Sequence, residues 1–343
     1  MTTSTQVRLA RRPQGEPTDD TYSFEDHELP ELTDGQLLLR VVYLSLDPYM
    51  RGRMSDAPSY AAPVEIGDVM VGATVCLVEE SRHPDFAEGD WVLSYSGWQT
   101  HAISDGRGLR KLDAGAVPVS TALGVLGMPG FTAYAGLLEI GRPQQGETVV
   151  VAAATGPVGS AVGQLARVKG ARAVGIAGGE QKRQALLDEF GFDVALDHRS
   201  PTFAEDLAAA VPDGIDVYFE NVGGPVAREV FKHVNLYARV PVCGLVADYN
   251  RTSAPEGPDR LPGFMGLVLR KSLTVRGFIQ SEFVESHTRD FVREMSGWVA
   301  DGSVRYREDV AEGLDSAPEA FRGLLAGRNF GKQLVRVAED PSR

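Results

Sequence analysis

A glycine-rich turn at residues 153–163 stands between an apolar run and a helical pattern. Its centre is Gly156, Pro157, Val158 and Gly159. Glycines let the backbone turn tightly and approach a pyrophosphate, whose charge is met by free amides and the positive end of the helix. The spacing is a variant of the GxGxxG pattern, and its context favours a dinucleotide site over a merely tight turn.

No acid follows at the place where such a site usually has one. The next apolar run ends in Gly178 and Gly179, where a site for NAD presents Asp or Glu to the ribose hydroxyls. Glycines leave room there for a ribose phosphate, and Lys182 and Arg183 could pair with it. Glu180 lies past the strand end and could cap the helix. A solvated helix start is the alternative, but we favour the phosphate, so the sequence predicts NADPH.

The composition limits which partners and which location the protein can have. The chain has 343 residues, enough for two domains with their own cores. A net charge of −13 argues against nucleic acid or an anionic membrane as a partner. The apolar runs are too short to cross a bilayer, and the polar first residues predict a cytoplasmic protein. Cys76 and Cys243 lie in different apolar segments and are typical of small buried hydrophobes.

The elements that must position the turn begin at residue 147. Apolar runs alternate there with helical patterns, which is typical of βαβ units on a parallel sheet. We expect strands at 147–154, 172–178, 194–197, 216–224, 238–246 and 272–279. We expect helices at 157–169, 180–190, 203–211, 225–234 and 264–271. The predicted fold class is α/β, with a six-stranded doubly wound parallel (Rossmann) sheet.

The flanking segments are β-rich, with strand-like runs separated by turn residues. The clearest runs are 36–47, 68–79, 89–104, 303–315 and 331–339, with a helix at 318–326. We therefore predict a β-rich domain made of residues 1–130 and 303–343, interrupted by a Rossmann domain at 131–302.

This arrangement resembles the medium-chain dehydrogenase/reductase superfamily, which implies a GroES-like barrel for the β-rich domain. Many of its alcohol dehydrogenases bind zinc through Cys and His. The segment LSLDPYM (44–50) has no Cys where that ligand would fall, and Asp68 and Val69 lie near the place of the His. Two cysteines cannot form a four-cysteine zinc lobe, and the six histidines show no ligand spacing. We expect no metal.

Longer motifs resemble the leukotriene hydroxydehydrogenase/prostaglandin reductase family, and most of all its bacterial NADPH-dependent curcumin reductases. The likeness covers nearly the whole chain. Its motifs are LSLDPYMRGRMSD (44–56), GMPGFTAYAGLLEIG (127–141), AAATGPVGSAVGQLARVKG (152–170), YFENVGG (218–224), VCGLVADYNRT (242–252) and GLLAGRNFGKQLVRV (323–337).

The resemblance implies a set of cofactor contacts. It places 156–159 at the pyrophosphate and Lys182 at the 2′-phosphate. Beside the rest of the cofactor it places Asn221, Cys243, Gly244, Leu245, Tyr249, Phe278, Ile279, Gln280 and Asn329, with 278–280 holding the nicotinamide amide through the backbone. His198 stands where the family often has Tyr, and an imidazole could still stack or hydrogen-bond near the phosphate.

The chemistry follows from the expected lack of a metal. A plain ketone is hard to polarise without a Lewis acid, whereas an α,β-unsaturated carbonyl needs less help. Hydride from NADPH can add to its β-carbon, and the negative charge then appears on the oxygen as an enolate. The resemblance implies this reaction, on enones such as curcuminoids or 2-alkenals.

Two tyrosines compete to stabilise the enolate, since a phenol stays protonated at neutral pH. Tyr249 follows the fifth strand at its carboxyl end, where open α/β sheets bind ligands. Tyr49 faces the cleft by resemblance, or packs on Arg51 or Arg53. We assign Tyr249 to the enolate and Tyr49 to substrate positioning, and the reverse stays open. Candidate pocket residues are Tyr60 and Met128.

Two other functions stay open: an NADPH quinone oxidoreductase, and a non-catalytic NADPH-binding redox sensor. DPYMRG and VADYNRT argue against the first, and the intact tyrosines and cofactor turn argue against the second. A homodimer is predicted through the edge strand 272–279. The alternative is an edge blunted by Arg276 and neighbouring loops.

Overall fold

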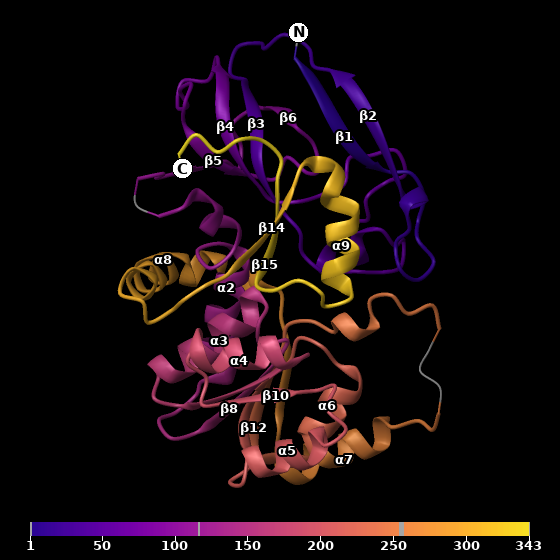
Figure 1. The fold of residues 1–343 in the computed structure, drawn as a ribbon, viewed down its shortest axis with the longest axis vertical. Helices are drawn as coiled ribbons and strands as arrows, with labels where there is room; N and C mark the ends of the chain where they lie inside the picture. Colours follow the sequence, from indigo (N-terminus) through magenta and orange to yellow (C-terminus); the bar gives the residue numbers. More distant parts are fainter. Residues whose placement is uncertain (1, 116, 254–256, 343) are drawn as a thin grey trace. The chain divides into compact units, whose positions relative to one another are not determined.

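The computed structural model describes residues 2–115, 117–253 and 257–342, in two compact units (Figure 1). The first unit consists of Met1–Gly124 with Glu308–Arg343, and the second of Val125–Arg307. The sequence placed these boundaries at 130 and 302 instead. Side-chain contacts explain the later second boundary, because Gln164 donates to the carbonyl of Arg305 at 2.8 Å and accepts from its amide at 2.7 Å.

A six-stranded parallel sheet forms the centre of the second unit, in the order β10-β9-β8-β11-β12-β13. The strands are β8 Thr148–Ala152, β9 Arg172–Ala177, β10 Val194–Asp197, β11 Ile215–Phe219, β12 Val234–Val242 and β13 Thr274–Gly277. The β8 strand is buried along its whole length, as the apolar run predicted. The predicted doubly wound Rossmann sheet is confirmed.

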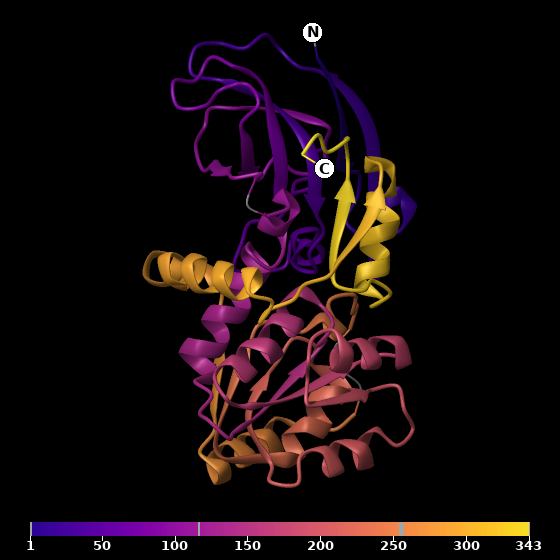
Figure 2. The ribbon, with the colours of Figure 1, turned by 60° about the vertical axis from the view of Figure 1, so that its left-hand side comes forward.

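The helices of the second unit are α2 Met128–Ala135, α3 Pro157–Val168, α4 Glu180–Asp188, α5 Phe203–Ala210, α6 Gly224–Val230, α7 Leu261–Lys271 and α8 Val284–Ala300. Sequence analysis missed α2 and α8, which lie side by side in Figure 2, as well as a π-helical turn at Gly136–Gly141. Phe131 and Phe291 join α2 to α8, with ring centroids 5.2 Å apart.

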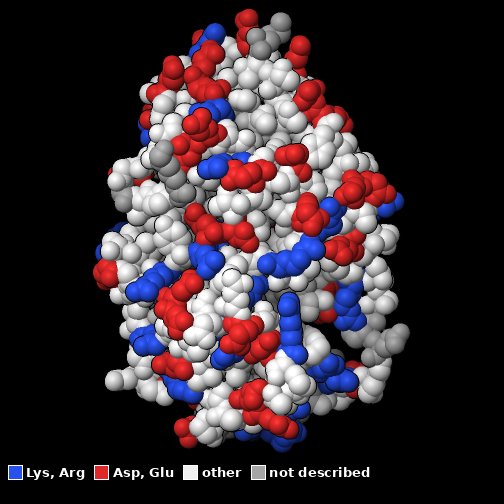
Figure 3. Space-filling view, viewed as in Figure 1, with Lys and Arg blue, Asp and Glu red and all other residues white. Residues whose placement is uncertain are grey.

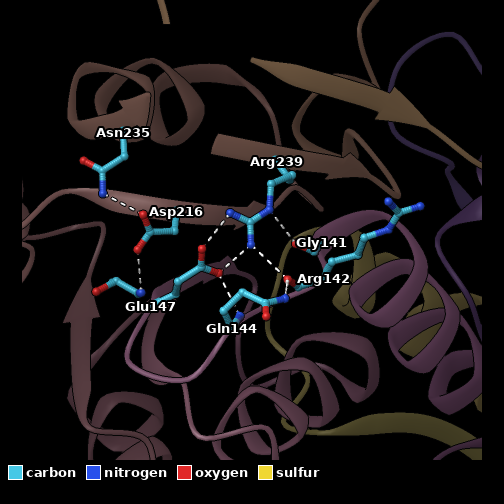
Figure 4. Close-up of polar contacts among 8 residues, drawn as sticks. Gly141, Arg142, Gln144, Glu147, Asp216, Asn235 and Arg239 are labelled. Atoms are coloured by element: carbon cyan, nitrogen blue, oxygen red, sulfur yellow. Dashed lines mark hydrogen bonds and ion pairs between the residues drawn. The ribbon is translucent and has the colours of Figure 1, made fainter. Parts of the chain in front are cut away.

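A polar network closes the amino ends of the central strands (Figure 4). The Arg239 guanidinium donates to the carbonyl of Gly141 at 2.8 Å and to the Glu147 carboxylate at 3.0 Å. Asp216 accepts from the amide of Thr148 at 2.9 Å. A ligand is expected at the opposite edge, because open α/β sheets bind ligands at the carboxyl ends of their strands.

The first unit is built around a mainly antiparallel sheet in the order β14-β15-β3-β4-β5-β7, with β6 paired to β3. Its elements are β1 Thr3–Leu9, β2 Tyr22–Glu28, β3 Leu37–Ser45, α1 Tyr49–Arg53, β4 Thr74–Ser81, β5 Trp91–Ser94, β6 His101–Ser104, β7 Arg110–Leu112, β14 Glu308–Glu312, α9 Ala317–Leu325 and β15 Lys332–Arg336. The C-terminal strand β15 pairs antiparallel with β3 and parallel with β14. The tail therefore belongs to this unit.

Short 3-10 helices fill several connections: Asp19–Thr21, Val119–Leu123, Phe231–His233, Val246–Asp248, Gln280–Phe283 and Leu314–Ser316. Within the described ranges, no helix has the length and apolar character that crossing a bilayer requires. Acidic and basic side chains are interspersed over the face shown in Figure 3.

Candidate cofactor and active site

The β8–α3 turn has the close backbone packing that the glycines predicted. Ala153 adopts a left-handed conformation with φ of 51°, and its carbonyl accepts from the amide of Gly156 at 3.0 Å. A Cβ on Gly159 would lie 2.4 Å from that same carbonyl, so only glycine fits there without a backbone shift. Pro157 opens α3 at a position where no amide is needed.

This turn fits a pyrophosphate. The amides of the first helical turn have no partners within the helix, and they point along the positive end of its dipole. The 12 residues of α3 give that end a full macrodipole. Val158 and Gly159 are the residues whose amides would hold the phosphates of NADPH.

The end of β9 is surrounded by basic side chains. A Cβ on Gly178 would lie 2.9 Å from Nε2 of His198 and 2.7 Å from Nε of Arg199. Desolvation and then the charge of Arg199 lower the pKa of His198; Asp197 opposes this shift, and Lys182 adds to it. The corner therefore fits an anion such as the 2′-phosphate of NADPH. Sequence analysis missed Arg199, although it directly follows His198 at the end of the strand beside β9.

The two bases predicted on α4 have different surroundings. Arg183 donates from Nε and Nη2 to the two carboxylate oxygens of Glu180, at 2.7 and 2.5 Å. The sequence suggested Glu180 as a cap of α4, but its carboxylate binds Arg183 instead. The N-cap residue of α4 is Gly179, and no side chain caps this helix. Lys182 is half-buried on the same turn and lies within electrostatic reach of His198.

A buried carboxylate organises the carboxyl ends of β11 and β12. Glu220 is 3% exposed and accepts from the amides of Val222 and Gly223 at 2.7 and 2.9 Å. Desolvation raises its pKa in spite of these hydrogen bonds. Its carbonyl accepts from the amides of Cys243 and Gly244, so the turn after β11 holds the loop after β12.

Asn221 lies on the same edge and ties two strands together. Its Nδ2 donates to the carbonyl of Ala152 at 2.9 Å, which joins the end of β11 to the end of β8. In the neighbouring loop, burial and the charge of Glu220 raise the pKa of the Cys243 thiol to about 12. The thiol therefore stays protonated at neutral pH.

Tyr249 follows the 3-10 turn Val246–Asp248 and is half-buried. A Cβ on Gly244 would lie 3.1 Å from its hydroxyl oxygen, which places that hydroxyl against the backbone of its own loop. Leu245 in this loop is 41% exposed. The loop thus brings a phenol and an apolar side chain to the carboxyl edge of the sheet.

The segment predicted to hold the nicotinamide amide already uses two of its amides. Phe278 donates to the carbonyl of Val242 at 3.3 Å, and Ile279 donates to the carboxylate of Glu282 at 2.8 Å. Gln280 begins the following 3-10 helix. Any backbone contact from 278–280 would therefore fall mainly to the carbonyl oxygens.

The first unit carries Tyr49, Tyr60 and Asn329, and the other predicted site residues belong to the second unit. Burial, followed by the charge of Asp47, raises the pKa of Tyr49, so its phenol is protonated. Tyr60 is 63% exposed and within electrostatic reach of Tyr49, as is Tyr95, which sequence analysis did not single out. Asn329 donates to the carbonyl of Gly331 at 2.9 Å.

A buried ion pair holds the segment that carries Tyr49. Lys332 Nζ donates to Oδ1 of Asp47 at 2.8 Å and to the carbonyl of Leu46 at 2.6 Å. The side chains are 3% and 6% exposed, and the other Asp47 oxygen accepts from Ser45. Burial lowers the pKa of Lys332. Spacing gives no hint of this pair, because its members lie 285 residues apart.

Met128 is the first residue of α2 and is half-buried; its carbonyl accepts from the Thr132 hydroxyl at 2.8 Å. The sequence left open that Tyr49 packs on Arg51 or Arg53. The Arg51 guanidinium donates to the carbonyl of Gly15 at 2.8 Å, and Arg53 lies within electrostatic reach of Tyr49. Within the described residues, no three His, Cys, Asp or Glu side chains are grouped as metal ligands.

Two family models match the chain. Residues 5–112 match the N-terminal domain of oxidoreductase, and residues 157–297 match zinc-binding dehydrogenase. The NADPH-dependent curcumin reductase of Escherichia coli (strain K12) is 55% identical over 332 residues, which cover 97% of this chain and 96% of that protein. Prostaglandin reductase 1 of Rattus norvegicus is 40% identical over 334 residues, 96% of this chain and 98% of that protein.

Solved structures share the fold. The crystal structure of CurA from Vibrio vulnificus in complex with NADPH has a TM-score of 0.94 and 51% identity, and the match covers 98% of this chain and 100% of that one. A quinone oxidoreductase from Pseudomonas syringae pv. Tomato DC3000 has a TM-score of 0.73 over 97% of this chain and 99% of that one. At 18% identity, it is similar in fold alone.

Proposed function

Because the chain belongs to the curcumin and prostaglandin reductase family of the medium-chain dehydrogenase/reductase superfamily, we propose that it reduces the C=C bond of α,β-unsaturated ketones and aldehydes with NADPH. Curcumin-type enones and 2-alkenals are the proposed substrates. The observation that carries the cofactor assignment is the end of β9, where glycines replace the acid of an NAD site and basic side chains surround them.

Bound NADPH supplies the hydride that reduces the β-carbon of the substrate. The amides of Val158 and Gly159 bind its pyrophosphate, and Lys182 pairs with its 2′-phosphate. Asn221 holds the ends of β8 and β11 in place beside it.

Tyr249 donates a hydrogen bond from its hydroxyl to the carbonyl oxygen of the substrate, where negative charge develops. Tyr49 orients the substrate, and its raised pKa keeps its hydroxyl a donor at every physiological pH. Tyr60 and Met128 contribute apolar surface to the substrate. The proton on the α-carbon comes from solvent, or from Tyr249 through a water molecule.

We also propose a homodimer that forms through β13. All four residues of this strand are exposed, and β12 is its only partner among the described strands. Arg276, the candidate edge-blunting residue, lies over the ring of Phe283 at 5.3 Å and pairs with Glu282. A second copy could therefore add its own β13 to the sheet. A cytoplasmic location stays a prediction.

The test measures oxidation of NADPH in the presence of an enone, a quinone or a saturated ketone. The near-ultraviolet absorbance of NADPH reports its consumption with each substrate. The proposal expects consumption with the enone and none with the saturated ketone. Rapid turnover of quinones alone would assign the chain to the quinone oxidoreductases, and tight NADPH binding without turnover of any of them would indicate a sensor.

A further inference from the structure

Glu220 is a buried carboxylate for which the reaction described above has no use. It directly follows β11 and is 3% exposed. Among the described side chains, no Lys, Arg or His forms an ion pair with it. A carboxylate buried without a cation destabilises the fold unless its hydrogen bonds compensate. Those hydrogen bonds show which part of the chain Glu220 holds.

One oxygen of this carboxylate fixes the turn after β11. Oε1 of Glu220 accepts from the amides of Val222 and Gly223 at 2.7 and 2.9 Å. Gly223 has a φ of 77°, a conformation that glycine adopts without steric cost. These two amides therefore bind within the turn itself, and the turn presents its carbonyl groups to the neighbouring segment.

The carbonyls of this turn hold the loop after β12. Four amides of the loop donate to them at 2.9 to 3.2 Å: Cys243 and Gly244 to Glu220, Val246 to Asn221, and Ala247 to Val222. The same loop carries Tyr249. A Cβ on Gly244 would lie 3.1 Å from the Tyr249 hydroxyl oxygen and 3.5 Å from the carbonyl oxygen of Asn221. The phenol therefore lies beside a loop residue that the turn holds in place.

We propose that Glu220 is a positioning residue for enone reduction: it fixes the turn after β11, and through this turn it holds the loop that places the Tyr249 hydroxyl. This inference rests on the proposed function, in which that hydroxyl donates to the substrate oxygen. A donor stabilises a developing negative charge most when it is held in place before the reaction. A small displacement of such a group lowers the rate steeply.

Two replacements separate the hydrogen bonds of Glu220 from its charge. Glu220→Leu leaves both amides of the turn without an acceptor. Glu220→Gln keeps an oxygen that can replace Oε1, and because this one oxygen binds both amides, it should restore the turn. We expect kcat for an enone to fall about tenfold or more in Glu220→Leu, and to stay within about threefold of the unmodified value in Glu220→Gln. Glu220→Met serves in place of the Leu variant if that protein does not fold.

A Tyr249→Phe background tests whether Glu220 acts through the phenol. The hydroxyl is absent there, so its position no longer matters. Adding Glu220→Leu to this background should lower kcat by less than about twofold, whereas two independent roles would give the full tenfold loss again.

Hydrogen exchange of the protein without substrate reports the loop directly. The amides of residues 243–249 should exchange about tenfold faster or more in Glu220→Leu, and at nearly the unmodified rate in Glu220→Gln. Asp216→Leu is the matched control, because it removes a carboxylate from the amino end of the same strand, where Asp216 accepts from the amide of Thr148. It should leave kcat and the exchange of the loop within about twofold of the unmodified values.

Unchanged loop exchange in Glu220→Leu would overturn the inference, as would a full tenfold loss of kcat in the Tyr249→Phe background. Equal losses in the Leu and Gln variants would also overturn it, since the charge would then matter and not the acceptor. Equal effects of Asp216→Leu would assign the losses to general destabilisation. If the unmodified protein reduces no enone, the proposed function fails, and the exchange rates still decide whether Glu220 holds the loop.

Discussion

Replacing Lys332 by Met tests whether a buried ion pair holds the segment that carries Tyr49. Met keeps the length of the stem but removes the ammonium, which leaves Oδ1 of Asp47 and the carbonyl of Leu46 without their donor. Because both side chains are almost fully buried, Asp47 would remain as an uncompensated charge. Breaking such a pair from one side costs about 3–5 kcal/mol of folding free energy.

Replacing Asp47 as well provides a check on the predicted loss of folding free energy. Asp47→Asn in the Lys332→Met background removes the stranded charge, and an amide can still bond to Ser45, the other partner of Asp47. The double variant should therefore recover about 2 kcal/mol or more relative to Lys332→Met alone. The recovered free energy measures the cost of leaving the Asp47 carboxylate buried without its cation.

Urea unfolding followed by tryptophan fluorescence measures both losses. Trp91 and Trp98 lie in the first unit with the ion pair, so a Trp298→Phe background makes the signal report on that unit alone. Two units can unfold separately, and this background avoids mixing their transitions. Equal destabilisation of the single and double variants, or a loss below about 1 kcal/mol for Lys332→Met, would refute the reasoning.

Three further perturbations test the site. Tyr249→Phe should lower kcat by about 10- to 100-fold with little change in the Kd of NADPH, and unchanged turnover would give the role to Tyr49. Gly159→Ala should destabilise the β8–α3 turn by about 1–3 kcal/mol and weaken NADPH binding. The matched Gly156→Ala should have a smaller effect, because its Cβ would lie 3.3 Å from the nearest carbonyl oxygen. Calorimetry of both variants compares their stability and their affinity for NADPH. The lowered pKa keeps His198 neutral at pH 7, and its imidazole gains a proton only as the pH falls below about 6.5. At low pH the unmodified protein should therefore prefer NADPH over NADH more strongly than His198→Gln does, and this difference should shrink at pH 7 and above. A pH-independent difference between the two proteins would contradict the assignment.

The parallel sheet could be predicted because short apolar runs alternate with helical patterns, and the central strand β8 is buried along its whole length, as is typical of a parallel sheet covered on both faces. The boundaries of β12 could not, because its pairing is set by hydrogen bonds to other strands. The sequence suggested 238–246, but the carbonyl of Glu220 binds the amides of Cys243 and Gly244 and turns the chain out of the sheet. The strand instead begins at Val234, beside Ile215 of β11.

The missed helix α8 carried a readable signal. Phe291 and Met295 are its buried residues and lie four apart, with Trp298 three residues further on. This spacing is that of one helix face, and the polar residues between them belong to the exposed face.

Some residues of the candidate site could be predicted from the sequence, and others could not. The glycine turn and the basic residues of α4 were visible because each lies within a short segment. The positions of Arg199 and Lys332 were not visible, since each depends on a neighbour that strand pairing brings close. Pairing of β9 with β10 places Arg199 beside Gly178, and pairing of β3 with β15 places Lys332 beside Asp47. Local spacing could have suggested the Glu180–Arg183 pair, which is three residues apart on one helix.

The most direct test of the account is the position of the transferred hydrogen. An enone is reduced with NADPH carrying deuterium at the reactive carbon of its nicotinamide, and the product is examined by nuclear magnetic resonance. The account predicts a saturated ketone with one deuterium at the former β-carbon and an intact carbonyl group. An unsaturated alcohol with deuterium on the former carbonyl carbon would contradict it.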